Sequence, residues 1–284
     1  MSNIAADRRR LASNGVYAAA ELQGHIEAKY FVKGKFHRIS VPVADLRLDP
    51  EREKLDRQLL YGDRFRVLHT DGQYAFGQAE RGDYVGYVES ANLKEWKAPN
   101  CKVDQKASVA FTSPDIKTPN PIRLPLGATL HVATHDERFA KTDLGLYVPT
   151  SHLVPLNRFA SDPVEVAAWF LGTPYLWGGN SDLGLDCSGL VQAACLACGI
   201  DCPGDSDQQE AELGMPIAQD APPKRGDLLF WKGHVAWVVD AETILHANAY
   251  HMAVAYEPIG DATQRIQAQG DGPVTSRKRL EFPS

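Results

Sequence analysis

The chain has 284 residues, of which 44% are hydrophobic and 23% are charged, an ordinary composition for a globular protein. This length predicts about two domains, or more if some are small, and the apolar content excludes disorder for most of the chain. No run approaches the roughly 18 apolar residues of a membrane span. The net charge of −6 argues against a nucleic-acid partner.

The N-terminus and the cysteines bear on the expected compartment. Residues 1–15 lack the apolar core of a secretory signal. The five cysteines are odd in number and too clustered for a disulfide framework. Both observations predict a cytoplasmic protein with reduced thiols, and we expect no membrane partner. The sequence leaves the oligomeric state open.

An internal repeat occupies the first half of the chain. Residues 59–67 (LLYGDRFRV) match residues 124–132 at a constant offset of 65, and residues 87–93 match residues 147–153 at an offset of 60. Short alternating segments separated by turns are typical of small antiparallel barrels. We therefore expect an N-terminal extension over 1–36, a first barrel over 37–97, a second barrel over 98–158 and a different domain over 159–284. Within the extension, residues 26–36 are compatible with a hairpin turning at Lys33 and Gly34.

Two residues of the first copy are not required by the repeat. Asp63 corresponds to Ala128, and Tyr84 corresponds approximately to Leu144. Each is a candidate ligand contact, although an exposed turn carboxylate and a surface aromatic are the simpler explanations.

The last 125 residues place a cysteine at the start of a helix. Asp162 followed by proline and Glu165 predicts one helix start, and the apolar stripe from Cys187 to Cys198, closed by Gly199, predicts a second helix. Unpaired N–H groups and the positive dipole end at the second helix start favour a thiolate and can stabilise an oxyanion.

The other cysteines of this region are better explained by packing. Cys195 and Cys198 lie deeper along the same helix and are expected to be inert core thiols. A zinc site formed with Cys202 is disfavoured, because the first two cysteines lie on a helix and no fourth ligand is nearby. We therefore expect no metal.

Two histidines lie on a predicted hairpin beyond this helix. His234 and His246 are each six residues from Asp240 in the turn, so we expect them to be near cross-strand neighbours on one face. A single histidine on a strand is more often structural. A facing pair, together with a helix-capping cysteine, favours a base and the group that orients it.

Five segments together resemble the NlpC-type family of papain-like cysteine peptidases, which cut bacterial cell-wall peptides. They are residues 172–179 (GTPYLWGG), 186–191 (DCSGLV), 225–230 (RGDLLF), 233–236 (GHVA) and 245–247 (LHA). The first half resembles bacterial SH3-like domains, best seen in residues 59–68 and in YVGYV at 84–88. The resemblance implies a multidomain chain, with two small SH3-like β-barrels followed by an α+β papain-like catalytic domain.

The combination looks like the γ-D-glutamyl-L-diamino acid endopeptidases of the dipeptidyl-peptidase VI type. The resemblance implies that Cys187 is the nucleophile, that His234 is the general base and acid, and that His246 orients His234. It implies no cofactor and a murein-peptide substrate with a free N-terminal L-alanine. The pocket for its L-Ala-γ-D-Glu portion would be lined by Tyr175, Asp186, Ser188, Asp205 and Ser206.

A buried substrate ammonium needs a carboxylate partner, and Asp186, Asp205 and Asp63 are the candidates. If the first barrel covered the cleft, Tyr84 and Asp63 would form the wall that excludes longer N-terminal extensions. A cytoplasmic enzyme would meet imported wall fragments, which predicts a role in cell-wall recycling.

Two other functions stay open at this point. One is a papain-like amidase or acyltransferase, which would need an apolar channel near Trp177 and Trp237. The other is a non-catalytic cell-wall-binding protein that uses its tandem barrels. The sequence does not decide which diamino acid is preferred.

Overall fold

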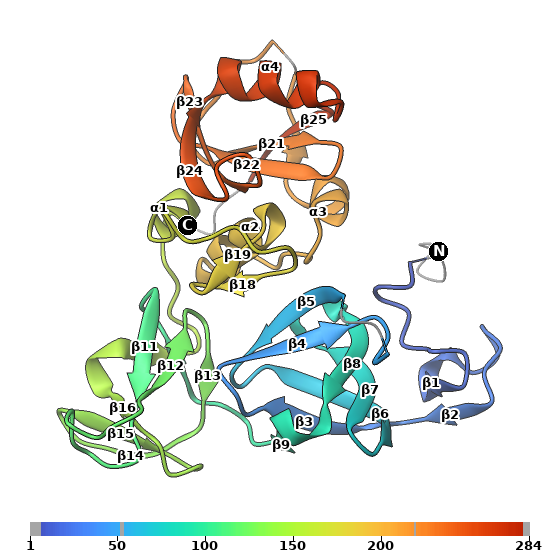
Figure 1. The fold of residues 1–284 in the computed structure, drawn as a ribbon, viewed down its shortest axis with the longest axis vertical. Helices are drawn as coiled ribbons and strands as arrows, with labels where there is room; N and C mark the ends of the chain where they lie inside the picture. Colours follow the sequence, from blue (N-terminus) through green and yellow to red (C-terminus); the bar gives the residue numbers. More distant parts are fainter. Residues whose placement is uncertain (1–6, 52–53, 219, 281–284) are drawn as a thin grey trace. The chain divides into compact units, whose positions relative to one another are not determined.

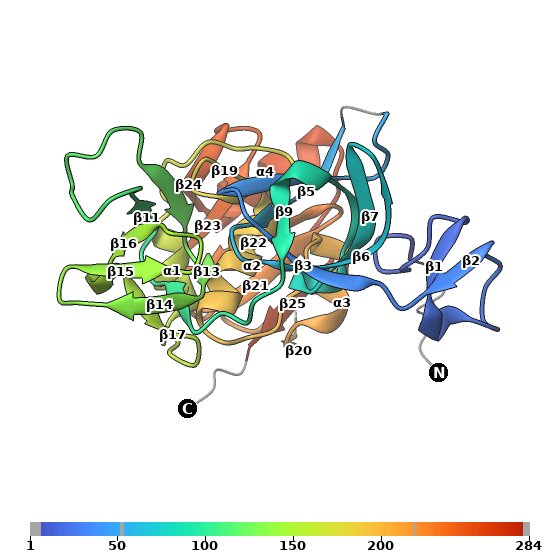
Figure 2. The ribbon, with the colours of Figure 1, turned by 90° about the horizontal axis from the view of Figure 1, so that it is seen from below.

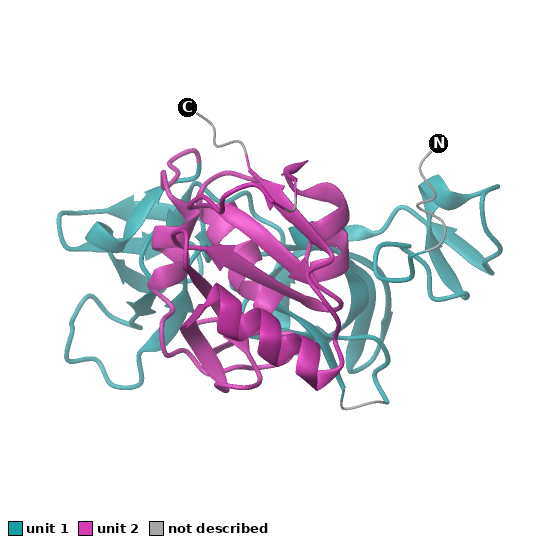
Figure 3. Ribbon diagram, turned by 90° about the horizontal axis from the view of Figure 1, so that it is seen from above, with its two compact units in different colours: residues 1–156 teal, residues 157–284 magenta. Residues whose placement is uncertain are grey.

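The computed structural model describes residues 7–51, 54–218 and 220–280, and the chain divides into two compact units, residues 1–156 and 157–284 (Figure 3). The expected finer boundaries at residues 36, 97 and 158 stay predictions. Within the described ranges, no helix combines the length and the apolarity that crossing a membrane requires.

The first unit is built around a seven-stranded antiparallel sheet with the order β5-β4-β8-β7-β6-β3-β9 (Figure 1). Alternation along its strands produces one buried face; in β6, for example, Phe65 is fully buried and packs with Ile39 and Leu46. The strands are β3 (Lys35–Ile39), β4 (Val43–Arg47), β5 (Leu55–Leu60), β6 (Arg64–Asp71), β7 (Tyr74–Ala79), β8 (Val85–Glu89) and β9 (Leu93–Glu95), and the 3-10 turns are η3 (Arg81–Asp83) and η4 (Ser90–Asn92).

The N-terminal segment pairs differently from the expected hairpin. Strands β1 (Tyr17–Ala19) and β2 (Tyr30–Val32) pair in parallel, with the 3-10 turn η2 (Ala20–Leu22) following β1. The predicted hairpin at Lys33 and Gly34 is therefore wrong. Gly34 has φ +72 and lies against β6, where a Cβ would stand 2.8 Å from the Val67 carbonyl oxygen. This close approach directs β3 onto β6, so β3 does not pair with β2.

The second half of this unit contains three small sheets in place of one (Figure 2). Their orders are β13-β10-β17, β11-β12 and β14-β15-β16. The strands are β10 (Cys101–Val103), β11 (Ala107–Ala110), β12 (Ile122–Pro125), β13 (Thr129–Leu130), β14 (Val132–His135), β15 (Phe139–Thr142), β16 (Tyr147–Pro149) and β17 (Leu153–Pro155), and the 3-10 turn η5 (Thr150–His152) precedes β17.

The two halves repeat the same turn geometry. Gly62 donates to the carbonyl of Ile39 at 2.8 Å, and Gly127 donates to the carbonyl of Val103 at 3.0 Å. Both glycines have positive φ, +83 and +76, which side chains rarely tolerate. The same turn is therefore present in both copies.

The prediction of closed barrels is wrong, because the sheets are open. In each copy a 3-10 turn carries the last strand across to the first, β9 onto β3 and β17 onto β10. Strands β5 and β9 consequently end the seven-stranded sheet as edges. Alternation and turns in a sequence locate strands but do not determine whether a sheet closes.

The second unit is an α+β fold around a six-stranded sheet with the order β20-β25-β21-β22-β23-β24. Helix α4 packs through Ala262 and Ile266 on the face that carries Ala236 and Ile244. Helix α2 contacts β22 and β23, and Figure 1 shows the two helices on opposite sides of the sheet. The strands are β18 (Asn180–Ser181), β19 (Gly184–Leu185), β20 (Met215–Pro216), β21 (Asp227–Trp231), β22 (His234–Val238), β23 (Thr243–Asn248), β24 (Ala253–Pro258) and β25 (Ser276–Arg279), and the helices are α1 (Pro163–Ala168), α2 (Cys187–Ala197), α3 (Ser206–Glu212) and α4 (Ile259–Gln269).

Both predicted helix starts in this unit are confirmed. Helix α1 begins after Asp162, whose side chain accepts a hydrogen bond from the Val164 amide at 2.8 Å. Helix α2 begins at Cys187, and Gly199 follows its C-cap with φ +75. Local capping chemistry therefore determines where the cysteine lies on its helix.

A largely buried ion pair connects the two copies of the repeat within the first unit. Arg38, on β3, donates two hydrogen bonds to Asp143, at 3.0 and 2.6 Å. Burial alone would raise the pKa of the Asp143 carboxyl, but the hydrogen bonds and charge of Arg38 outweigh burial and lower the pKa. The carboxylate therefore stabilises the fold in its ionised form.

We predict that Asp143→Asn lowers the free energy of unfolding at pH 7 by about 2 kcal/mol, because it leaves Arg38 without its buried anion. The carboxyl pKa is lower in the folded than in the unfolded chain, so the stabilisation is complete above the unfolded pKa of about 3.9 and is lost as the pH falls through the folded value. Urea unfolding at pH 7 and in acid measures both effects. Glu95→Gln is the matched control, because the Lys35–Glu95 pair is exposed and longer, at 3.6 Å. Equal losses in the two variants would contradict the prediction.

Candidate active site

The candidate nucleophile lies at the first position of α2. Asp186, the N-cap, accepts hydrogen bonds from the Gly189 amide at 2.6 Å and from the Gly178 amide at 2.9 Å. One carboxylate thus connects the start of the helix to the preceding loop. The Cys187 Sγ lies 3.9 Å from the carbonyl oxygen of Gly233, which places the sulfur beside the turn that precedes His234.

Gly189 allows the helix to approach this loop closely. A Cβ at position 189 would collide with the carbonyl oxygen of Gly179 and would stand 2.8 Å from the Asn180 side-chain oxygen. A residue with a side chain would therefore displace the start of α2, and Cys187 with it. Steric limits therefore explain why the third residue of the Cys-Ser-Gly triplet is a glycine.

The two predicted histidines are in direct contact. The His234 Nε2 lies 2.8 Å from the His246 Nδ1. The register pairs Trp237 with Leu245, and extending it places His246 opposite Ala236. The symmetric placement about Asp240 is therefore wrong by two residues, and the rings meet as diagonal neighbours, which a sheet also allows.

A glutamate and an arginine extend this chain of contacts. The His246 Nε2 lies 3.0 Å from Glu257 Oε2, and Arg265 donates to both carboxylate oxygens, at 2.9 and 2.7 Å. Glu257 comes from β24 and Arg265 from α4. Burial alone would raise the pKa of Glu257, but the hydrogen bonds from His246 and Arg265 outweigh burial and lower the pKa to about 2.

This arrangement determines the tautomer of both rings. An ionised Glu257 only accepts hydrogen bonds, so His246 carries its proton on Nε2. Burial lowers the pKa of His246, and in the neutral ring Nδ1 is an acceptor. His234 must then donate from Nε2, which leaves its Nδ1 as the ring nitrogen that can take a proton. Burial, followed by the charges of His246 and Arg265, lowers the pKa of His234 to about 3, so His234 is a neutral base at rest.

The remaining thiols of this unit lie in its core, as the sequence predicted for Cys195 and Cys198. Cys195, Cys198 and Cys202 are buried, and none of the three forms a disulfide. A hydrogen bond to Cys202, together with burial, raises the pKa of Cys195 well above its ordinary value. Such thiols are weak nucleophiles.

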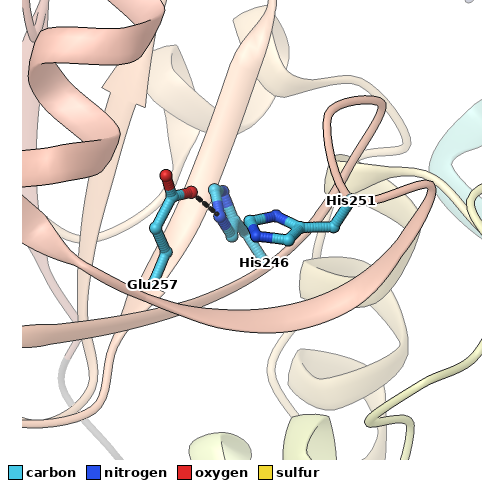
Figure 4. A group of neighbouring side chains, drawn as sticks. All are labelled: His246, His251 and Glu257. Atoms are coloured by element: carbon cyan, nitrogen blue, oxygen red, sulfur yellow. Dashed lines mark hydrogen bonds and ion pairs between the residues drawn. The ribbon is translucent and has the colours of Figure 1, made fainter.

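Three side chains beside the histidine pair have metal-ligand chemistry. Ligand atoms of His246, His251 and Glu257 lie within 4.8 Å of one another (Figure 4). Figure 4 also shows the hydrogen bond that already joins His246 to Glu257. An ion bound here would replace this bond and would remove the constraint on the His246 tautomer.

The predicted substrate residues of this unit have different environments. Tyr175 lines a cavity that also contains His234. Asp186 and Ser188 are buried, and the Ser188 hydroxyl donates to Asp186 at 3.1 Å. Asp205 is the N-cap of α3, and Ser206 is the first residue of that helix. Their contacts with substrate stay predictions.

Asp63 and Tyr84 have structural partners inside the first unit. Asp63 accepts two hydrogen bonds from Arg81, at 2.7 and 2.8 Å, and one from the Leu60 amide. Tyr84 is 1% exposed and belongs to the core cluster of the sheet. The repeat comparison did not reveal these partners, and a role at the substrate stays a prediction for both residues.

Sequence reasoning did not find Glu257 or Arg265. Neither belongs to a segment with a recognisable motif. Glu257 meets His246 only because β24 pairs with β23 in one particular register, in which Glu257 lies opposite Ile244. The available signal was a charged residue in an otherwise apolar strand, Ala253–Pro258, which is weak by itself.

Comparisons with known proteins identify the family of this chain. The profile of the NlpC/P60 family matches residues 172–267, and that of the bacterial dipeptidyl-peptidase Sh3 domain matches residues 46–93. Dipeptidyl-peptidase 6 of Lysinibacillus sphaericus is 37% identical over 237 residues, which cover 72% of this chain and 85% of the relative. The chain belongs to the NlpC/P60 family. It is therefore a cysteine peptidase with a dipeptidyl-peptidase-type SH3 domain.

This NlpC/P60 peptidase is also similar to a second curated relative and to a solved structure. A protein of Bacillus subtilis (strain 168) named gamma-D-glutamyl-L-lysine dipeptidyl-peptidase is 29% identical over 219 residues, covering 68% of this chain and 72% of the relative. The crystal structure of an NlpC/P60 family protein from Bacillus cereus ATCC 10987 superposes with a TM-score of 0.73 at 18% identity, over 88% of this chain and all of that one. At this identity the superposition supports the fold alone.

We predict that Glu257→Leu slows alkylation of Cys187 by iodoacetamide about tenfold in this NlpC/P60 peptidase. Without an acceptor, His246 can donate from Nδ1, which moves the His234 proton onto Nδ1 and removes the base. Glu257→Gln keeps an acceptor oxygen and should therefore slow the alkylation of Cys187 less than Glu257→Leu does. The difference should persist at pH 5.5, because the pKa of His234 is about 3.

Mass spectrometry of each labelled cysteine measures this effect. A purely structural role for Glu257 would lower the melting temperature and expose Cys195 to the reagent, without a selective change at Cys187. Equal Cys187 rates in Glu257→Leu and the wild type would refute the tautomer argument.

Proposed function

We propose that this peptidase hydrolyses the bond between γ-D-glutamate and the diamino acid of peptidoglycan stem peptides and releases L-Ala-γ-D-Glu. The observation that carries the proposal is the 2.8 Å contact between His234 and His246, with the Cys187 sulfur beside Gly233. The name of the Bacillus subtilis relative supports the γ-D-glutamyl bond, and the names of both relatives support the dipeptide product.

In the first half of the reaction, His234 Nδ1 takes the Cys187 proton while the sulfur attacks the scissile carbonyl carbon. The resulting oxyanion lies at the N-terminus of α2, where the helix dipole favours negative charge. The imidazolium of His234 then protonates the leaving amine, the carbon–nitrogen bond breaks, and a thioester remains. His246 and Glu257 hold the ring during this step, and the Glu257 charge favours the transient imidazolium.

In the second half, His234 takes a proton from water, and the hydroxide attacks the thioester. The carbon–sulfur bond breaks, the proton returns to the sulfur, and the dipeptide acid leaves. Neither half requires a metal or an organic cofactor, because one thiol and one imidazole account for each proton that moves.

The proposed substrate has a free N-terminal L-alanine. In an intact wall this amine is joined to the glycan, so a free amine arises only after the stem has been detached. We therefore propose that the enzyme acts on released wall fragments, in a cytoplasmic recycling role. Of the candidate ammonium partners, Asp186 and Asp205 lie in this unit, and Asp63 lies in the first unit.

We also propose that residues 98–158 form a second SH3-like module. The matching turns at Gly62 and Gly127, and the matching 3-10 turns before β9 and β17, support this assignment. The acyltransferase alternative needed an apolar channel near Trp177 and Trp237. Trp237 is fully buried, and Trp177 shares its cavity with the charged Lys232, so the hydrolase is the better-supported choice.

We expect Cys187→Ala to abolish dipeptide release from L-Ala-γ-D-Glu-meso-diaminopimelate, because the proposed thioester forms on the Cys187 sulfur. Liquid chromatography with mass spectrometry quantifies L-Ala-γ-D-Glu. Cys101→Ala, a change in the first unit, is the matched control and should keep the wild-type rate. Turnover by Cys187→Ala would remove this residue from the mechanism.

We expect acetylation of the substrate N-terminus to lower kcat/KM at least a hundredfold, because a buried, paired ammonium contributes several kcal/mol that a neutral amide cannot replace. The same assay with free and acetylated tripeptides measures the ratio. Cleavage that does not depend on the acetyl group would eliminate recognition of a free L-alanine, while leaving the peptidase mechanism intact.

A further inference from the structure

A cavity of about 550 Å³ adjoins the histidine pair in the second unit. Four segments form its walls. They are the β21–β22 turn with Lys232 and His234, the end of β23 and the residues after it (248–250), the end of α4 with Arg265 and Asp271 just beyond it, and the loop with Tyr175 and Trp177. The nucleophile Cys187 is not among the lining residues. The cavity therefore lies on the imidazole side of the site.

The imidazole side receives the leaving group. His234 protonates the amine that departs, so the residue bearing this amine must lie within hydrogen-bond reach of His234. In the proposed reaction this residue is the diamino acid. The cavity beside His234 offers space for its side chain.

Two charges in the cavity wall have no partner in the fold. Lys232 and Asp271 form no ion pair or side-chain hydrogen bond with the described residues, and both are exposed. Arg265 differs from them, because its guanidinium is committed to Glu257 and to the Gln269 side-chain oxygen, at 3.0 Å. The wall thus offers one uncommitted cation and one uncommitted anion.

We propose that this cavity selects a diamino acid whose side chain ends in both an ammonium and a carboxylate, as in meso-diaminopimelate. The inference rests on the proposed function. Asp271 binds the ammonium and Lys232 binds the carboxylate. An L-lysine side chain satisfies Asp271 alone and places its ammonium in the field of Lys232, which disfavours it. The preference would distinguish this chain from the relative whose name specifies L-lysine.

Three tripeptides test the selection: L-Ala-γ-D-Glu followed by meso-diaminopimelate, by its side-chain amide, or by L-lysine. We expect kcat/KM to be about fivefold higher for the diaminopimelate peptide than for either of the others, the size typical of a solvent-facing ion pair. The ratio should shrink in 1 M salt, because salt screens exposed charges. The amide isolates the carboxylate, since it keeps the ammonium.

Charge-neutralising variants assign the two contacts. In Lys232→Met, kcat/KM for the diaminopimelate peptide should be nearly equal to kcat/KM for its side-chain amide. Amidation has no further effect in this variant, because both changes remove the same ion pair. Asp271→Asn should lower kcat/KM for all three peptides, since all three carry the ammonium. Lys224→Met and Asp201→Asn are matched controls, because both residues are exposed in the same unit and neither lines this cavity.

The outcomes separate this inference from the proposed function. Equal kcat/KM for the three peptides, or a preference that survives Lys232→Met unchanged, would overturn the inference and leave the γ-D-glutamyl hydrolase standing. Failure to cleave any of the three would overturn the proposed function and the inference with it.

Discussion

The hydrogen bond between His246 and Glu257 is the contact on which the catalytic arrangement depends. It fixes the proton of His246 on Nε2, and the position of the His234 proton on Nε2 follows from the rule that each nitrogen of a neutral ring either donates or accepts. Arg265 keeps the carboxylate ionised and thereby makes this rule effective. The nucleophile at the start of α2 consequently faces a base that is prepared by residues from two strands, β23 and β24, and from helix α4.

The sequence predicted the parts of the site that depend on local chemistry. Cys187 could be placed because an N-cap carboxylate, an apolar stripe and a closing glycine define a helix on their own. The contact between His234 and His246 followed from strand alternation, even though the register was two residues off. Each of these inferences uses residues that are close in sequence.

The remainder depends on pairing that no local pattern encodes. Glu257 joins the site only through the register between β23 and β24. The charges of Lys232 and Asp271 share a cavity only because α4 ends beside the β21–β22 turn. The prediction of closed barrels failed for the same reason, because closure depends on which distant strands pair at the edges of the sheet. The repeat marked Asp63 as unexplained because its partner, Arg81, is itself outside the repeated pattern.

The double attachment of Asp186 constrains how selectivity can evolve. The same carboxylate holds the start of α2 and the amide of Gly178, next to Trp177 in the cavity wall. A mutation that remodels this loop would also shift the Cys187 sulfur. A change of substrate preference acquired in this loop would therefore lower the rate of catalysis. The turn bearing Lys232 and the segment after α4 lie in other parts of the chain. Divergent members of such a lineage are therefore expected to vary first at those two places.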